Sequence, residues 1–230
     1  MKDLIFCGIG SALETEFNNN CAIYLDKKDI LIIDPNENSV KYLINKKILT
    51  EKTKNVTIAI THTHSDHISG LGQLIWQCAI RFKIVPIIIS NSITFQKSLK
   101  KLLTLMGIDK SYYIFSENNV YNTANVCIEM IKTKHTKDLE CFGIILKDDK
   151  YKIYYSGDTN DFKQISNIIL DKTFNRIYLE LSHYPKSHIE YNDIKKLKNL
   201  NKIIAMHLTK EIYEEIIKDG VIEVAKEVCF

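Results

Sequence analysis

One short segment of the 230-residue sequence, Thr61-His62-Thr63-His64-Ser65-Asp66-His67, limits the possible folds more than any other feature. It contains three of the seven histidines of the chain. The apolar, β-branched residues 56–60 predict a buried strand before it, and apolar spacing from Gln73 to Arg81 predicts a helix after it. The histidines are therefore expected in a turn between a strand and a helix, where a rigid scaffold presents side chains to a cleft.

The residue types in this segment indicate metal binding. Imidazoles and carboxylates are ligands for zinc, manganese and iron. His62 and His64 are two residues apart, so in an extended segment both rings lie on the same side. Asp66 and His67 point in other directions as the chain turns into the helix. One loop can thus serve two neighbouring metals, with His62 and His64 on the first and Asp66 and His67 on the second. The alternative interpretation is a polar surface loop that happens to be rich in histidine.

Length and composition are those of an ordinary globular protein. Hydrophobic residues make up 45% of the chain and charged residues 26%, and the length suits a single domain over residues 1–230. A net charge of +3 is too small to argue for nucleic acid by itself. No apolar run is long enough to span a bilayer, so we expect a cytoplasmic protein without a membrane partner.

The cysteines do not indicate a disulfide framework or a cysteine metal site. No two of the six form a C-x-x-C pair, and most lie in apolar segments, so buried free thiols are expected. They are Cys7, Cys21, Cys78, Cys127, Cys141 and Cys229.

Apolar periodicity and turn residues predict the remaining elements. Strands are expected at Leu4–Cys7, Cys21–Leu25, Ile30–Asp34, Ile84–Ile89, Cys127–Thr133, Cys141–Leu146, Tyr151–Tyr155, Arg176–Leu181, Lys202–Met206 and Val221–Val224. Helices are expected at Ser39–Ile48, Ser92–Met106, Asp161–Leu170, Tyr191–Leu200 and Lys210–Lys218. Along the chain, strands come first and a mixture of strands and helices follows, and this order occurs twice. It predicts two sheets packed face to face with helices outside.

Some local features remain open to more than one interpretation. Gly8-Ile9-Gly10-Ser11 is a turn that needs the freedom of glycine, and Asp34 is a possible cap for the helix that follows it. Tyr112, Tyr113 and Phe115 fit core packing, with a dimer seam or a base-stacking pocket as alternatives.

Three further polar residues share one property with the histidine segment. His135, Asp158 and His207 each lie at or just past the C-terminal end of an apolar strand. Any one of them alone is more often a solvated polar residue. Together they add two imidazoles and a carboxylate to the candidate ligands.

The H-x-H-x-D-H segment resembles the signature of the metallo-β-lactamase superfamily, and most closely its phosphodiesterase branch, which includes ribonuclease Z. The resemblance extends over nearly the whole chain and implies an α/β fold, the four-layer αββα sandwich. It also implies that His135 joins His62 and His64 on the first metal, that His207 joins Asp66 and His67 on the second, and that Asp158 bridges the two. Asp34 would lie near the metals without binding them. Two divalent ions are implied, with Zn²⁺ expected and Mn²⁺ as the alternative.

The same resemblance implies a hydrolytic mechanism. Paired cations generate a bridging hydroxide that attacks phosphorus in line, and Asp66 can accept the proton of that water. In the ribonuclease Z branch a strand-end glutamate orients a histidine that protonates the departing oxygen. Glu180 and His188 occupy the matching segments. The alternatives are a solvated glutamate with a surface histidine, or His183 as the acid or as a hydrogen-bond donor to a ligand.

The absence of one feature directs the choice of substrate. Ribonuclease Z carries a protruding Gly/Pro-rich arm that binds transfer RNA, and no segment between these motifs is rich in glycine and proline. Folded RNA is therefore a less favoured partner, and a small nucleotide phosphodiester such as a 3′,5′-cyclic nucleotide fits better. Similar compact proteins include phage enzymes that degrade cyclic-nucleotide immune signals, which implies a role in evading anti-phage defence.

Two alternatives to the cyclic-nucleotide phosphodiesterase remain. One is an endonuclease of the ribonuclease Z type that processes RNA 3′ ends. The other is a metal-binding interaction protein without turnover. The resemblance also implies a homodimer, because dimers are common among such proteins.

Overall fold

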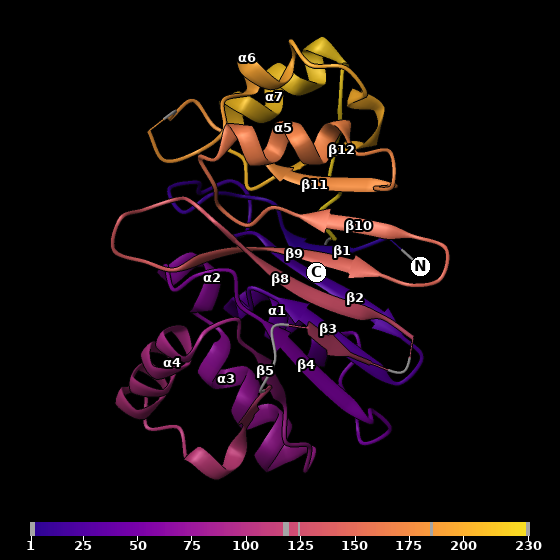
Figure 1. Cartoon of the computed structure of the whole chain (residues 1–230). Helices are drawn as coiled ribbons and strands as arrows, with labels where there is room; N and C mark the ends of the chain where they lie inside the picture. The colour runs from indigo at the N-terminus through magenta and orange to yellow at the C-terminus, as the bar shows by residue number, and fades with distance from the viewer. Residues whose placement is uncertain (1–2, 117–119, 124, 185, 229–230) are drawn as a thin grey trace.

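Two β-sheets with helices on their outer sides make up the computed structural model, which describes residues 3–116, 120–123, 125–184 and 186–228 (Figure 1). This is the αββα arrangement that the sequence predicts. Cys229, one of the six cysteines, lies outside the described residues. The other five are free thiols, four of them buried and Cys127 half-buried.

The first sheet has the strand order β1-β2-β3-β4-β5-β6. Its strands are β1 (Ile5–Gly8), β2 (Cys21–Asp26), β3 (Asp29–Ile33), β4 (Asn55–Ala59), β5 (Ile87–Ile89) and β6 (Ile114–Phe115). The first three strands pair antiparallel, and β3 to β6 pair parallel. The carboxyl ends of β3 and β4 therefore lie at the same edge of the sheet.

The second sheet has the order β13-β12-β11-β10-β9-β8-β7. Its strands are β7 (Val120–Asn122), β8 (Cys127–Thr133), β9 (Cys141–Lys147), β10 (Lys152–Tyr155), β11 (Arg176–Glu180), β12 (Ile203–Met206) and β13 (Glu223–Val224). Strands β7 to β10 are antiparallel, and β10 to β13 are parallel. Strands β8, β10, β11 and β12 thus all run toward one edge.

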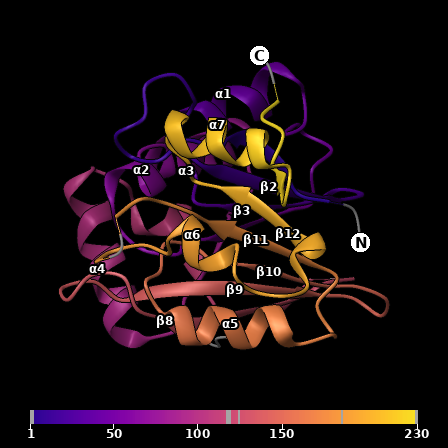
Figure 2. The same ribbon diagram turned by 90° about the horizontal axis from the view of Figure 1, so that it is seen from above.

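Helices form the two outer layers. They are α1 (Glu37–Asn45), α2 (Ser65–Ile68), α3 (Leu71–Trp76), α4 (Ile93–Leu105), α5 (Phe162–Leu170), α6 (Tyr191–Ile194) and α7 (Lys210–Asp219). Helices α5, α6 and α7 lie across the second sheet, and α3 and α4 lie on the opposite side of the molecule (Figures 1 and 2).

The alternation of side chains along the central strands explains the layers. On β10, Ile153 and Tyr155 belong to the buried cluster that contains the inner faces of both sheets. Tyr154, between them, belongs to the cluster under α5, α6 and α7. Successive side chains of a strand point to opposite faces, so a strand that is apolar at every position is buried on both sides. Helices must therefore cover the outer face of the second sheet.

Several predicted elements have different limits. The helix predicted at Tyr191–Leu200 is wrong beyond Ile194, because α6 ends there and Leu200–Lys202 form a separate 3₁₀ turn. The chain has left the helix by Asn199, which adopts a left-handed conformation with φ 65° that cannot continue a right-handed helix.

The strand predicted at Ile84–Ile89 is shorter than expected, since β5 begins at Ile87. The amide of Ile84 instead donates to the carbonyl of Cys78, and Pro86 has no amide hydrogen to contribute to the ladder. The helix predicted at Gln73–Arg81 begins earlier, at Leu71, and continues past Trp76 as a π-helical turn over Gln77–Arg81.

Two local interpretations of the sequence are also resolved. The cap of α1 is Asn36, whose Oδ1 accepts a hydrogen bond from the amide of Ser39 at 2.9 Å, so the proposed capping role of Asp34 is wrong. Tyr113 is buried, and Tyr112 and Phe115 pack against the same core. Core packing is therefore the correct interpretation of this aromatic group.

Candidate metal centre

The predicted ligands come from the carboxyl ends of strands in both sheets. His62 and His64 follow β4, with Asp66 and His67 on the short helix α2. The other three follow the second sheet: His135 after β8, Asp158 after β10 and His207 after β12. Strands that run toward one edge of two stacked sheets place their following residues around one point, so residues far apart in sequence meet there.

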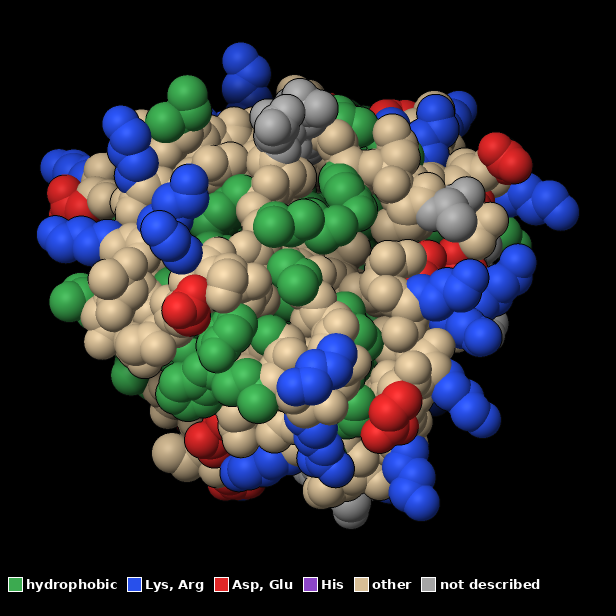
Figure 3. Space-filling view, turned by 90° about the horizontal axis from the view of Figure 1, so that it is seen from below, with side chains coloured by type: hydrophobic (Ala, Val, Ile, Leu, Met, Phe, Trp, Pro, Cys, Tyr) green, Lys and Arg blue, Asp and Glu red, His purple; other side chains and the backbone are tan. Residues whose placement is uncertain are grey.

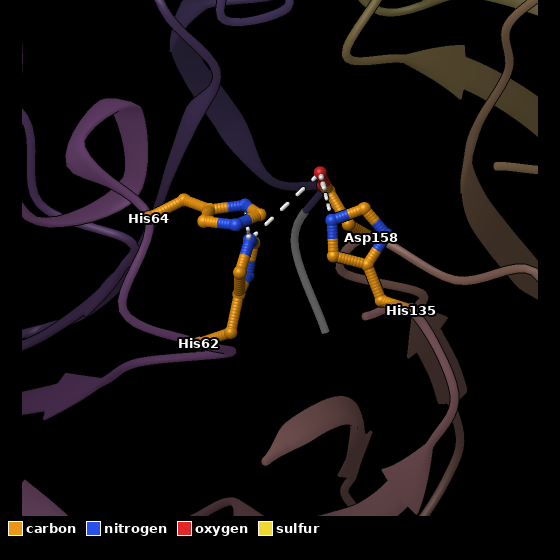
Figure 4. Close-up of side chains that lie close together, drawn as sticks. All are labelled: His62, His64, His135 and Asp158. Carbon is orange, nitrogen blue, oxygen red and sulfur yellow. Dashed lines mark hydrogen bonds and ion pairs between the residues drawn. The ribbon is translucent and has the colours of Figure 1, made fainter. Parts of the chain in front are cut away.

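Four side chains form the first group of possible ligands. His62, His64, His135 and Asp158 each offer a ligand atom, and these atoms all lie within 4.8 Å of one another (Figure 4). The two histidines of the β4 loop face His135 and Asp158 from the other sheet (Figure 4). His135 is oriented by a 2.7 Å hydrogen bond between its Nδ1 and the carbonyl oxygen of Ser187. That bond leaves Nε2 free to face the site, 3.6 Å from Oδ2 of Asp158.

Asp66, His67 and His207 form the second group. Oδ2 of Asp66 lies 3.2 Å from Nε2 of His67 and 3.3 Å from Nε2 of His207. His207 has a positive φ of 55°, a backbone conformation that residues other than glycine rarely adopt. Such strain is often found where function requires one particular side-chain direction.

Asp158 lies between the two groups and directs one oxygen to each. Its Oδ2 is 3.9 Å from Nε2 of His62 and 3.6 Å from Nε2 of His135. Its Oδ1 is 3.3 Å from Nε2 of His67 and 3.5 Å from Nε2 of His207. A carboxylate in this position can share its two oxygens between two cations.

Two buried polar atoms at this point have no hydrogen-bond partner among the described residues. They are Nε2 of His67 and Oδ1 of Asp158. Buried polar atoms are nearly always satisfied in folded proteins, and an unpaired one costs about 1–3 kcal/mol. Both atoms are metal-ligand atoms and both face the same space, so the residues present fit a bound cation.

The electrostatics of the first group also fit a cation. Burial lowers the pKa of His62 well below its usual value, and the positive potential of neighbouring His67 lowers it further. Burial is also the main cause that lowers the pKa values of His64 and His135. Neutral imidazole is the form that binds metal.

The second group has the opposite balance of charge. Burial opposes protonation of His67, but the carboxylates of Asp158 and Asp34 outweigh it and raise its pKa. Burial alone would raise the pKa of Asp66, but the hydrogen bond from His207 and the positive charge of His67 outweigh it and lower the pKa. The Asp66 carboxylate therefore stays ionised, and the carboxylates around His67 favour positive charge at this point, which a bound cation would supply in place of a proton.

Asp34 holds the histidine segment in place through contacts with Thr61 and His67. Its Oδ2 lies 2.9 Å from Nδ1 of His67 and accepts a hydrogen bond from the hydroxyl of Thr61. Its Oδ1 accepts from the backbone amide of Thr61 at 2.7 Å. With Nδ1 of His67 held by a carboxylate, Nε2 is directed into the site. Asp34 makes no direct contribution to either ligand group.

Glu180 and His188 form a buried pair beside the two groups. Glu180 is fully buried at the end of β11, and its Oε2 lies 2.8 Å from Nδ1 of His188. The backbone amide of Thr159 donates to the other carboxylate oxygen at 2.9 Å. Burial opposes protonation of His188, but the Glu180 carboxylate outweighs it and raises the pKa of His188 to about 9. This arrangement is not that of a solvated glutamate beside a surface histidine.

His188 has a second possible role. Asp158, His188 and His207 also bring ligand atoms within 4.8 Å of one another. His183, by contrast, does not line the cleft: it is half exposed, and its Nε2 lies 3.5 Å from Oε2 of Glu215 on α7. His183 is therefore not placed to act as the acid or as a hydrogen-bond donor to a ligand, the alternatives that the sequence left open.

An open cleft of about 250 Å³ leads to these groups. Sequence reasoning missed most of its other lining residues, because they are hydroxyl and apolar side chains in loops without any motif. They are Ser11, Ala12, Leu13, Thr136, Leu181, Ser182, Tyr184, Ser187 and Thr209. No lysine or arginine lines the cleft among the described residues.

Comparison with known proteins identifies relatives across the whole chain. The family model described as "Anti-Pycsar protein Apyc1" matches residues 2–230. The protein of that name from Saccharibacillus brassicae is 25% identical over 190 residues, which cover 78% of this chain and 76% of the relative. Ribonuclease Z from Methanococcus maripaludis is 27% identical over 143 residues, but these cover 62% of this chain and only 44% of that enzyme.

Solved structures share the fold at low sequence identity. The metallo-β-lactamase fold protein YhfI from Bacillus subtilis superimposes with a TM-score of 0.76 at 12% identity, covering 98% of this chain and 97% of that one. The chain therefore has the metallo-β-lactamase fold, as the histidine segment led us to expect. None of the helices in the described ranges combines the length and the apolar character that a membrane crossing requires.

Proposed function

Because the chain belongs to the anti-Pycsar protein Apyc1 family, we propose that it hydrolyses small nucleotide phosphodiesters at a dinuclear metal centre. It is a metal-dependent hydrolase of the metallo-β-lactamase superfamily. The finer proposal is that two divalent ions bind, Zn²⁺ with Mn²⁺ as the alternative, and that 3′,5′-cyclic nucleotides are the substrates. A cytoplasmic location stays a prediction from the sequence.

The observation that carries the proposal is the position of Asp158. Its two oxygens face two separate groups of imidazoles, and Oδ1 is buried without a hydrogen-bond partner among the described residues. We propose His62, His64 and His135 for the first ion, Asp66, His67 and His207 for the second, and Asp158 for both. A pair of cations held in this way supplies a hydroxide nucleophile at neutral pH and neutralises phosphate charge.

The protein's own groups would then manage the protons. Asp66 is ionised and can accept the proton of the attacking water. His188 is favoured in its protonated form, because the Glu180 carboxylate raises its pKa to about 9. It can donate that proton to the departing 3′ oxygen, with Glu180 holding the ring in place through Nδ1. Breakage of the bond between phosphorus and the 3′ oxygen yields a nucleoside 5′-monophosphate.

Two features of the cleft favour a small substrate over folded RNA. Its volume of about 250 Å³ is close to the lower end of small-molecule pockets, which range over about 300–1,000 Å³. Its described lining contains no lysine or arginine, whereas binding along an RNA backbone relies on such residues.

A substrate panel tests the proposal. The metal-loaded protein is incubated with cyclic mononucleotides, cyclic dinucleotides, precursor transfer RNA and bis(p-nitrophenyl) phosphate. We expect 5′-monophosphates from cyclic mononucleotides and uncut RNA. Cleavage of the RNA 3′ trailer with intact cyclic nucleotides would support the ribonuclease Z alternative, which the 27% identity to that enzyme keeps open. Metal binding without turnover of any of these substrates at any pH would favour the interaction protein.

We also propose a homodimer in which a second copy covers an apolar surface on the first-sheet side. The face seen from below carries clusters of hydrophobic side chains (Figure 3). Trp76 and Ile80, both about half exposed, line a groove on α3 and its π-helical turn. Leu105 and Met106 are exposed at the end of α4. Apolar side chains of this size are typical of the centre of a subunit interface.

A further inference from the structure

Two exposed apolar side chains lie at the metal cleft and have no role in the chemistry described above. Leu13 is 83% exposed and Tyr184 is 60% exposed. Both line the same cleft as His135, Asp158 and His188. Single exposed apolar residues are common on protein surfaces, so exposure alone has no significance. The attachment of their two loops to the site is the informative observation.

The loop that carries Tyr184 is fixed to the proposed acid. The Tyr184 amide donates to Oγ of Ser182 at 3.1 Å. The Tyr184 carbonyl accepts from the amides of Ser187 and His188 at 3.1 and 3.0 Å. The backbone of Tyr184 is therefore held relative to His188, while its ring stays accessible to a ligand.

The loop that carries Leu13 is fixed to the segment after His207. The Ser11 amide donates to the carbonyl of Leu208 at 3.0 Å. Two residues beyond Ser11 comes Leu13, and Oε2 of Glu14 accepts from the Lys210 amide, the first residue of α7, at 2.7 Å. A carboxylate is favourable at the start of a helix. Leu13 is thus attached to the ligand-bearing loop on both sides.

The cleft lining thus combines two chemically different sets of side chains. One set consists of the histidines and carboxylates that suit cations and phosphate. The other consists of an aromatic ring and an aliphatic side chain on anchored loops, together with the hydroxyl groups of Ser11, Ser182 and Thr209. A nucleotide has the same division, with an anionic phosphate and a planar, weakly polar base.

We propose that Tyr184 and Leu13 form the nucleobase subsite, in which the base stacks on the Tyr184 ring and contacts the Leu13 side chain. This inference rests on the proposed function, because it assumes a nucleotide ligand. Stacking on an aromatic ring tolerates every base, since each base has a π face. The subsite therefore favours nucleotides over phosphate esters without a base, and it discriminates little among the bases.

Binding of the reaction product tests the subsite without requiring turnover. Affinities for a nucleoside 5′-monophosphate and for ribose 5-phosphate are measured by calorimetry on the metal-loaded protein. We expect the Tyr184→Ala variant to bind the nucleotide roughly 5- to 100-fold more weakly, the loss typical of one stacked base. Ribose 5-phosphate should bind equally to both proteins, and Tyr184→Phe should keep the nucleotide affinity. Leu13→Ala should show a smaller loss in the same direction.

Tyr151→Ala is the matched control, because Tyr151 is a similarly exposed tyrosine (45%) in the turn between β9 and β10, outside the cleft lining. It should leave both affinities unchanged. A wild-type protein that binds the nucleotide no more tightly than ribose 5-phosphate, or a Tyr184→Ala variant that weakens both ligands equally, would overturn the subsite.

Kinetics then separate this inference from the proposed function. With a cyclic nucleotide, Tyr184→Ala should raise KM and leave kcat near its wild-type value. A loss in kcat with no change in nucleotide affinity would instead mean that the ring positions His188, and the subsite would be wrong. If the wild-type protein prefers nucleotides but hydrolyses none, the subsite stands and the phosphodiesterase proposal fails.

Discussion

At the scale of single residues, His188 is the group whose role is most open to a direct test. If it protonates the leaving oxygen, His188→Ala should slow hydrolysis of a cyclic nucleotide by about 10²–10⁴-fold, the usual contribution of general acid catalysis. The rate with bis(p-nitrophenyl) phosphate should change far less, because nitrophenolate leaves without a proton. Initial rates on both substrates measure the difference.

The control for this prediction is His183→Ala, since His183 contacts Glu215 outside the cleft. It should leave both rates unchanged. Equal losses on both substrates in His188→Ala would contradict the acid role. In that case His188 would act as a ligand, in the group that it forms with Asp158 and His207.

Asp158 has a separate residue-scale prediction. The Asp158→Ala variant lacks the carboxylate that is proposed to serve two ions, so the metal content of the purified protein should fall. Elemental mass spectrometry should find fewer than two ions per chain. Asp149→Ala, in the exposed turn before β10, is the matched control and should keep the wild-type content. Retention of two ions by Asp158→Ala would remove Asp158 from the bridge.

At the scale of elements, the turn after β10 decides where Asp158 lies. Gly157 has a φ of +57°, and a Cβ there would lie 2.6 Å from the carbonyl oxygen of Phe142 and 2.8 Å from the side chain of Thr61. Both obstacles are parts of the site scaffold. The turn can therefore accept a larger residue only by moving Asp158 or the strand before the histidine segment.

We expect Gly157→Ala to lower both thermal stability and metal content. Gly220→Ala provides the matched comparison, because Gly220 has a similar φ of +62° but nothing lies within 4 Å of a Cβ there. That variant should lose only about 1–2 kcal/mol, the strain of a left-handed residue, and keep its metal. Equal effects of the two substitutions, measured by calorimetry and metal analysis, would show that the steric contact does not matter.

The elements also show where sequence patterns are sufficient. Ser92, where the predicted helix Ser92–Met106 begins, accepts from the amide of Phe95 and caps α4. Gly220 caps the C-terminal end of α7, close to the predicted end at Lys218. These signals depend on neighbouring residues alone. The predicted end of α6 and the predicted start of β5 were wrong, because a left-handed Asn199 and a proline at 86 outweighed apolar spacing.

At the scale of the whole molecule, the proposed homodimer predicts a change in mass. The double variant Trp76→Asp/Ile80→Asp should be a folded monomer, because both side chains are already half exposed and new charges disfavour only the covered state. Analytical ultracentrifugation measures the mass and circular dichroism the fold. Tyr151→Asp, on a different surface, should remain a dimer. A monomeric wild-type protein at micromolar concentration would contradict the proposal.

The sequence by itself determined the chemistry of this protein and the order of its layers. The H-x-H-x-D-H segment and the strand-end positions of His135, Asp158 and His207 indicated the candidate metal ligands that the structure brings together, since residue type and strand periodicity are local properties. A strand with apolar side chains on both faces, such as β10, must be covered by helices on its outer face.

Only the tertiary structure decided which atoms face each other. How the two sheets stack decides the directions of the two Asp158 oxygens and the contact between Glu180 and His188. It also decides that His183 lies beside Glu215 and that Leu13 and Tyr184 line one cleft. The physical reason is that these contacts join residues from separate strands and loops, and no local pattern records the relative placement of the two sheets.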